Sequence, residues 1–111
     1  YYYNYKDHTL ELVAEGDHRK LSAAQDFAFE APLNIVYVAN LALFDNKGID
    51  RTKAEFLSGQ DAAGYAENVN LYAAGHNLKA ITRGSLKSAE VLTLLGLEKG
   101  HTVVLAQTVG K

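Results

Sequence analysis

The segment of residues 81–85, with the sequence ITRGS, offers the clearest setting for chemistry on a flat ligand. A glycine at the end of a strand lets a planar group approach the backbone, because no side chain stands in the way. Backbone N–H groups that are free there can donate hydrogen bonds to the heteroatoms of a ring. The segment is therefore a candidate binding site for a planar heterocycle. The ordinary alternative is that Arg83 is a solvated cation and Gly84 a plain turn residue.

Other reactive residue types give little support for catalysis or for a metal site. The chain contains no cysteine, which excludes disulfides, thiolate zinc sites and thiol nucleophiles. The motifs GxSxG, GxGxxG and GxxxxGK[ST] are absent, so neither an activated serine nor a phosphate-binding loop is indicated. The histidines never stand at i and i+4, the spacing at which a helix presents two ligands to one metal. We therefore assign no metal site and no catalytic residue, and we expect His8, His18, His76 and His101 at the surface.

The loop at residues 45–48, DNKG, has some of the residue types of a calcium-binding loop. An EF-hand places oxygen ligands at alternate positions and a glycine at the sixth position. Here Lys47 occupies a ligand position and Gly48 comes too early. We therefore interpret the segment as an ordinary loop.

Tyr1, Tyr3 and Tyr5 alternate along the first expected strand and would share one of its faces. Aromatic rings in such a row can stack against bases or sugars. Nucleic-acid sites also carry interleaved basic residues, and none alternates with these tyrosines. A hairpin rich in strand-favouring aromatic residues is the preferred interpretation.

Length and charge limit the class of protein. A chain of 111 residues, of which 48% are hydrophobic, is sufficient for a single domain with one modest core. Its net charge of -2 gives no electrostatic reason to expect nucleic acid or an anionic membrane as a partner. No apolar run approaches the roughly 20 residues that a membrane span needs, and no signal peptide is visible. The compartment stays open, with the cytoplasm favoured.

The longest element should be a helix over residues 61–76. Small side chains recur there at spacings of three and four, which places them on one face. Larger apolar residues fill other faces, so we expect burial on several sides and close approach of another backbone. Asn77 should end the helix, because Asn tolerates the left-handed conformation at a helix C-terminus. The small residues are Ala62, Ala66, Val69 and Ala73, and the larger ones are Tyr65, Leu71 and Tyr72.

The remaining pattern predicts an α+β fold with a mainly antiparallel sheet. The apolar run of residues 33–41, which follows Pro32, predicts a strand covered on both faces. We expect this strand and residues 101–109 to be the inner strands, with the long helix packed across the sheet. The other expected elements are strands at 1–6, 9–14 and 80–82, an irregular segment at 25–31, and short helices from Asp17 to about 24, from Asp50 to about 57, and from a cap at Ser85 or Ser88 up to Gly96.

Several of these segments together resemble the flavin-dependent nitroreductase family. Residues 61–84, DAAGYAENVNLYAAGHNLKAITRG, are similar to the C-terminal half of the family, above all to its thiazoline/oxazoline-dehydrogenase-like branch. Residues 25–38, QDFAFEAPLNIVYV, show a further likeness. Glu67 and Asn77 stand where the family commonly has Gln and Gly. The matching residues are Asn68, Val69, Leu71, Tyr72, Leu78 and Gly84.

The resemblance implies an FMN-dependent oxidoreductase that passes two electrons from a reduced nicotinamide, or a similar donor, to a small oxidised substrate. It implies that Thr82, Arg83 and Gly84 contact the flavin ring, with a backbone N–H directed toward its N5 edge. Lys111 is expected near the phosphate. Relatives pair through the long helix and hold flavin at the interface, so we expect a homodimer.

The resemblance also implies that the chain is a C-terminal portion. The chain begins without an initiator methionine and contains no methionine at all. We therefore expect a fragment or a processed product that on its own binds FMN weakly or not at all. The alternative function is a non-catalytic α+β binding or assembly module that keeps the fold without flavin.

Overall fold

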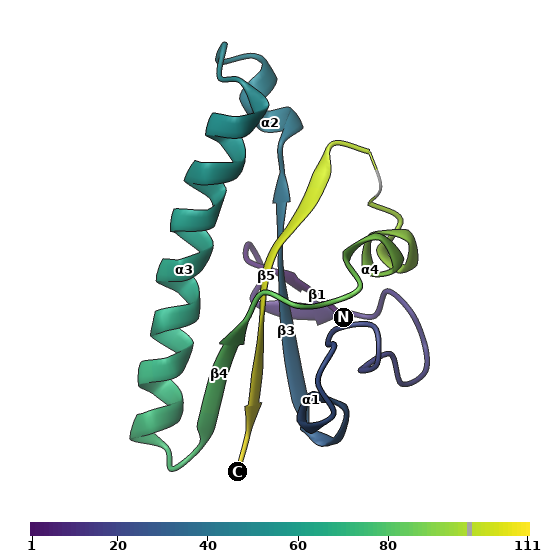
Figure 1. Ribbon diagram of the computed structural model, residues 1–111, viewed down its shortest axis with the longest axis vertical. Helices are drawn as coiled ribbons and strands as arrows, with labels where there is room; N and C mark the ends of the chain where they lie inside the picture. The colour runs from purple at the N-terminus through teal and green to yellow at the C-terminus, as the bar shows by residue number, and fades with distance from the viewer. Residues whose placement is uncertain (98) are drawn as a thin grey trace.

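A three-stranded antiparallel sheet with the order β3-β5-β4 organises the molecule (Figure 1). Its strands are β3 (Leu33–Asn40), β4 (Lys79–Arg83) and β5 (His101–Gly110). The structure is a computed structural model and describes residues 1–97 and 99–111. The predicted α+β class with an antiparallel sheet is confirmed, and β5 is an inner strand as expected. The prediction that β3 is also an inner strand is wrong for this sheet, because no described strand pairs with its outer edge.

The two faces of the sheet carry different layers (Figure 1). The helix α3 (Arg51–Gly75) lies along one face, where it contacts β4 and β5. The helix α4 (Ser88–Leu95) contacts β5 on the opposite side. Because successive strand residues point to opposite faces, the side chains of Gln107 and Thr108 of β5 point toward different layers. This alternation decides which residues surround the candidate site.

The helix α3 is one continuous element that begins earlier than predicted. Asp50 caps it, as expected, by accepting a hydrogen bond from the backbone N–H of Lys53. The separate helix expected over residues 50–57 is simply its first two turns, and Ser58 and Gly59 do not interrupt it. At the other end Asn77 has a φ of 56°, so the predicted left-handed stop is confirmed.

The small residues of α3 pack against the sheet of the same chain. Four alanines are buried there, whereas the large residues on the other sides of the helix are exposed. Within this chain the expected burial on several sides is not found, because only the alanine side of the helix is covered. The alanine side of the helix is flat, so the sheet can approach closely and cover it. The buried residues are Ala54, Ala62, Ala66 and Ala73, and the exposed ones include Phe56, Tyr65, Leu71 and Tyr72.

A buried amide holds α3 on the sheet. The side chain of Gln107 is completely buried, and its Nε2 donates to the backbone oxygen of Ala66 at 2.9 Å and to Asn70 Oδ1 at 2.7 Å. Its Oε1 accepts a hydrogen bond from the Tyr37 hydroxyl at 2.7 Å. Burial raises the pKa of Tyr37 above its ordinary value, which keeps this hydroxyl protonated as a donor. One side chain thus links β3, β5 and α3.

The N-terminal part forms a small hairpin of β1 (Tyr2–Asn4) and β2 (Thr9–Glu11). Its strands are shorter than predicted, and His8 takes a left-handed conformation between them. The tyrosines of this hairpin are exposed.

The helix predicted from Asp17 to about residue 24 does not form. The carbonyl of Leu21 accepts from the backbone N–H of Lys87, and the carbonyl of Ser22 accepts from Arg83. In place of a helix the segment forms turns, in which the backbone N–H groups of Leu21 and Ser22 donate to the carbonyls of His18 and Arg19. Short helices appear instead at α1 (Phe27–Glu30) and α2 (Ala42–Asp45), in segments expected to be irregular or loop.

The helix α4 ends as predicted at Gly96, which has a φ of 67°. Its start differs from the prediction, because Lys87 is the cap residue and no side chain caps the helix. The link between Lys87 and Leu21 fixes the entry of the chain instead. None of the described helices is both long and apolar enough to cross a membrane.

Substitution by alanine at two glycines should change the free energy of unfolding in opposite directions. Gly96→Ala should lower the free energy of unfolding by about 1 kcal/mol, because a Cβ disfavours its left-handed backbone. Gly64→Ala, within α3 and with no neighbouring atom within 4 Å of the new Cβ, should raise it by about 0.5–1 kcal/mol. Urea titration measures both changes, and equal signs would contradict the helix boundaries given above.

Candidate functional site

The candidate site is the turn that follows β4. Gly84 is exposed, and a Cβ placed on it would meet no other heavy atom within 4 Å. Gly84 and Ser85 lie outside the helices and strands. Their backbone N–H groups donate no hydrogen bond to a described backbone or side-chain acceptor. The turn therefore presents open space beside two available amide donors. This is the arrangement that a planar heterocycle with hydrogen-bond acceptors on its edge requires.

Thr82, Arg83 and Gly84 are contiguous, but the structure gives them different environments. The side chain of Thr82 is exposed and that of Arg83 is buried, with only 5% of the residue accessible. The interpretation of Arg83 as a solvated cation is therefore wrong. Only its backbone lies at the candidate binding surface, because its side chain points into the protein.

The guanidinium of Arg83 forms hydrogen bonds with oxygen atoms of three other segments. Its Nε donates to Thr108 Oγ1 of β5 at 2.8 Å, and its Nη2 donates to Asn34 Oδ1 of β3 at 2.9 Å. Its Nη1 donates to the backbone oxygen of Ser22 at 2.8 Å and, more weakly, to that of Ser85 at 3.4 Å. Burial lowers the pKa of Arg83 from its ordinary value, but arginine in proteins stays protonated.

The oxygens around Arg83 are neutral, and none of the described carboxylates forms an ion pair with it. They are also bonded to one another. Thr108 Oγ1 donates to Asn34 Oδ1 at 2.6 Å, and Asn34 Nδ2 donates to the backbone oxygen of Ala28 in α1 at 2.7 Å. The buried cation thus stands at the centre of a network that joins the sheet to the segment preceding it.

Lys111 does not lie at the turn. Arg83 pairs with Ala106, whereas Lys79 pairs with Gly110 at the other end of the same ladder. Four residues of strand separate these pairs, which corresponds to about 13 Å. The structure therefore separates Lys111 from the other predicted site residues by the length of β4.

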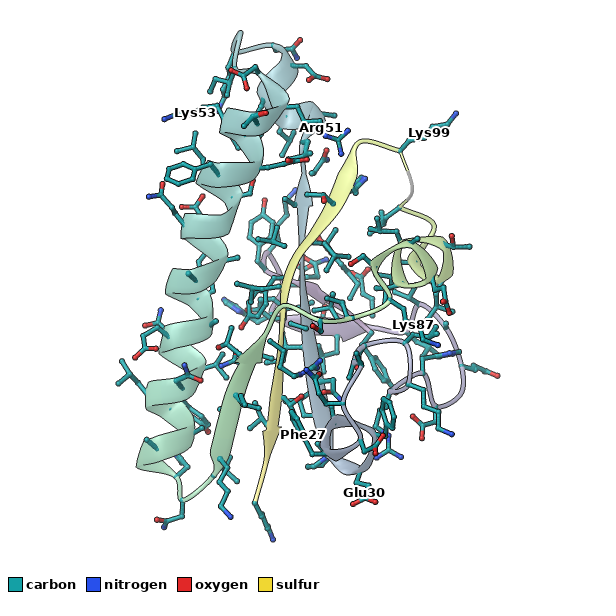
Figure 2. The ribbon with its side chains drawn as sticks, viewed as in Figure 1. Phe27, Glu30, Arg51, Lys53, Lys87 and Lys99 are labelled. Atoms are coloured by element: carbon teal, nitrogen blue, oxygen red, sulfur yellow. The ribbon has the colours of Figure 1, made fainter. Side chains whose placement is uncertain are left out.

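Lys111 lines a cavity of about 400 Å³ together with Lys79 and residues of α1 and β4. Figure 2 labels two further lining residues, Phe27 and Glu30, toward the end of the molecule where Figure 1 marks the C-terminus. The walls are largely apolar, with two lysines and one glutamate contributing charge. This cavity is a second concave surface, distinct from the turn after β4.

The sequence interpretation missed Ser22, Asn34 and Thr108. The signal for two of them is present in the sequence, because Asn34 and Thr108 are polar residues within strongly apolar strands. A polar residue in a buried strand needs a hydrogen-bond partner, and Arg83 was the available cation. Ser22 accepts through its backbone carbonyl, and the residue type does not predict such a contact.

The other candidates of the sequence add nothing to this site. Among residues 1–97 and 99–111, no group of three or more acidic or histidine side chains is placed to hold a metal ion. Asp45, from the loop once compared with a calcium site, is the last residue of α2. Tyr3 bonds to His8 within the exposed hairpin.

The polar network should contribute measurably to stability. Thr108→Val removes the acceptor of Arg83 Nε and leaves that buried donor unpaired, so the free energy of unfolding should fall by about 1–3 kcal/mol. Thr102→Val is the matched control on the same strand, where the hydroxyl bonds to no described side chain or backbone group, and should change it by less than about 0.5 kcal/mol. Chemical denaturation of both variants measures the difference, and equal effects would show that the network is energetically neutral.

Comparison with known proteins places these features in a family. One solved structure, described as a putative nitroreductase from Ralstonia eutropha JMP134, aligns with a TM-score of 0.86 and 33% sequence identity. The alignment covers 98% of this chain and 51% of that one, so the chain spans about half the length of its structural relative. No curated protein matches the chain. The sequence description of the nitroreductase family matches residues 3–111, and the chain therefore belongs to the nitroreductase family.

Proposed function

We propose that the protein to which this chain belongs is an FMN-dependent oxidoreductase, with the chain as its C-terminal portion. It passes two electrons from a reduced nicotinamide, or a similar donor, to a small oxidised substrate. Nitroreductase family members typically use flavin, which supports the cofactor class. The observation that carries the proposal is the open turn at Gly84 with its two available amide donors.

The residues present fit the ring of a flavin. The absence of a side chain at Gly84 leaves room for a flat ring against the backbone, and the amides of Gly84 and Ser85 can donate to nitrogen or oxygen atoms on its edge. When bound, FMN supplies the hydride chemistry, and the protein tunes it through hydrogen bonds to the ring. In this proposal Thr82, Arg83 and Gly84 contact the ring through the backbone, because the Arg83 side chain is turned inward.

The proposed phosphate contact of Lys111 has a ground of its own, the cavity that this residue lines. Lys111 and Lys79 flank the same cavity, so two ammonium groups are available to an anion there. That cavity lies at the far end of β4 from Gly84. We therefore keep Lys111 as a proposed phosphate contact, and the proposal for the ring depends on the turn alone.

The thiazoline/oxazoline-dehydrogenase-like branch is the finer assignment that we propose within the family. Its support is the sequence ENVNLYAA within α3. Glu67, which replaces the glutamine common in relatives, accepts a hydrogen bond from Asn70 Nδ2 at 3.1 Å. Asn70 Oδ1 in turn accepts from the buried Gln107. The carboxylate thus orients Asn70 on the helix surface, as the side-chain oxygen of a glutamine could also do.

We also propose that the protein is a homodimer that pairs through the outer side of α3. Tyr65 and Tyr72 are seven positions apart and share one side of the helix, and both are exposed, as is Leu71. Exposed aromatic and aliphatic side chains of this kind are enriched at interfaces. Ala66 and Ala73 do not belong to this surface, because both are buried against the sheet.

The flavin proposal is tested by titrating FMN into the full-length protein and following flavin fluorescence. The full-length protein should bind FMN, and the 111-residue chain alone should bind it weakly or not at all. Gly84→Val should raise Kd at least about tenfold, because its side chain fills the space proposed for the ring. Gly48→Val, at an exposed glycine between α2 and α3 with no heavy atom within 4 Å of the new Cβ, is the control and should leave Kd unchanged at a temperature where the variant is folded.

A full-length protein that ignores FMN would favour the alternative of a non-catalytic binding or assembly module. A 111-residue chain that binds as tightly as the full-length protein would contradict the expected contribution of other segments.

The dimer proposal is tested with charges on the outer side of α3. Tyr65→Glu and Leu71→Glu should shift the full-length protein from dimer to monomer, because each buries a carboxylate in the proposed interface. Leu43→Glu is the matched control, since Leu43 of α2 is as exposed as Leu71, at 67% and 64% accessible. Sedimentation velocity distinguishes the species, and a wild-type monomer would refute the proposal.

A further inference from the structure

The buried side chain of Arg83 indicates the role of this residue more clearly than its position beside the candidate site does. Of the arginines in the chain, Arg51 is exposed and Arg19 is half-buried, whereas Arg83 is almost fully enclosed. An enclosed guanidinium without a carboxylate partner is costly unless its N–H groups are bonded. Here all three nitrogens donate to oxygen atoms. The position therefore requires an explanation beyond that of an ordinary surface cation.

The partners of Arg83 surround the start of the turn. Nη1 bridges the backbone oxygens of Ser22 and Ser85, so one nitrogen connects the turn with the segment before α1. On the other side of the guanidinium, Nε and Nη2 donate hydrogen bonds to Thr108 and Asn34 in the sheet. The guanidinium group can reach these acceptors simultaneously because its N–H donors diverge in one plane.

A second contact reinforces the same connection. The backbone N–H of Lys87 donates to the oxygen of Leu21 at 3.2 Å, one residue before Ser22. The turn is thus tied to the segment of residues 21–22 on both sides of Gly84. Between these two ties lie the available N–H groups of Gly84 and Ser85.

We propose that Arg83 is a positioning residue: its buried guanidinium holds the backbone of residues 83–85 so that the N–H groups of Gly84 and Ser85 keep one direction toward a bound ring. Its side chain does not touch the ligand. The inference rests on the proposed function, because the ring is taken to be that of FMN. Donors that are fixed before the ligand arrives need no reordering on binding, which strengthens binding.

The first test measures the order of the turn and needs no flavin. Backbone ¹⁵N relaxation of the full-length protein should give Gly84 and Ser85 order parameters near 0.85 in the wild type, the value of a rigid backbone. In Arg83→Met they should fall below about 0.6, the range of flexible segments. Gln107→Leu is the matched control, because it breaks a buried polar cluster on the opposite face of the sheet. It should leave the turn ordered.

The second test measures the ligand at a temperature where every variant is folded. Arg83→Met should raise the Kd for FMN about tenfold, equivalent to about 1.4 kcal/mol, and should shift the visible absorption bands of the bound flavin. Gln107→Leu, although destabilised, should keep the wild-type Kd and spectrum. A purely structural role of Arg83 predicts instead that both variants bind alike once folded.

Milder variants keep the inference testable if Arg83→Met does not fold. Thr108→Val and Asn34→Ala each remove one acceptor and should lower the order parameters of Gly84 and Ser85 by a smaller amount. A turn that stays ordered in every foldable variant would overturn the positioning role, whatever happens to FMN. A wild-type protein that does not bind FMN would overturn the proposed function, while the relaxation data would still decide whether Arg83 orders the turn.

Discussion

The structure depends on the burial of two neighbouring polar residues in the middle of its sheet. Gln107 and Thr108 follow each other on β5, and both are almost inaccessible. A buried polar group must be hydrogen-bonded, or it costs about 1–3 kcal/mol. Because neighbours on a strand point to opposite faces, Gln107 bonds to α3 and Thr108 bonds to Arg83 on the other side. The same pair also fixes the register of β5, because a slip by one residue would present each polar group to the wrong layer.

Much of the fold could be predicted from the sequence because it follows from local patterns. The lone proline before an apolar run located β3, and a glycine and an asparagine located the ends of α4 and α3. The predictions failed where tertiary contacts override local preference. Asp17 has a good residue type for a cap, but the residues after it form turns, and the carbonyls of Leu21 and Ser22 bond to Lys87 and Arg83. Strand order is likewise a property of the whole sheet, which the pattern of β3 alone does not contain.

The candidate site could be located from the sequence but not built from it. A glycine at a strand end is a local signal, and it led to the turn at Gly84. The support of that turn comes from Ser22, Asn34 and Thr108, which lie 61, 49 and 25 residues from Arg83 in the sequence. The residue type of Arg83 is equally compatible with a solvated surface, and only the fold shows that its side chain is enclosed.

The two polar residues of β5 support the two faces of the sheet separately. The alanines of α3 let the helix approach closely enough for the amide of Gln107 to reach the backbone oxygen of Ala66. A larger residue at that position would separate helix and sheet and leave the amide unpaired. Gln107 thus bonds the sheet to α3, while the next residue, Thr108, points to the other face and accepts a hydrogen bond from Arg83. One polar residue therefore holds α3 on the sheet and its neighbour supports the turn at Gly84 and Ser85, so the two clusters can be broken separately.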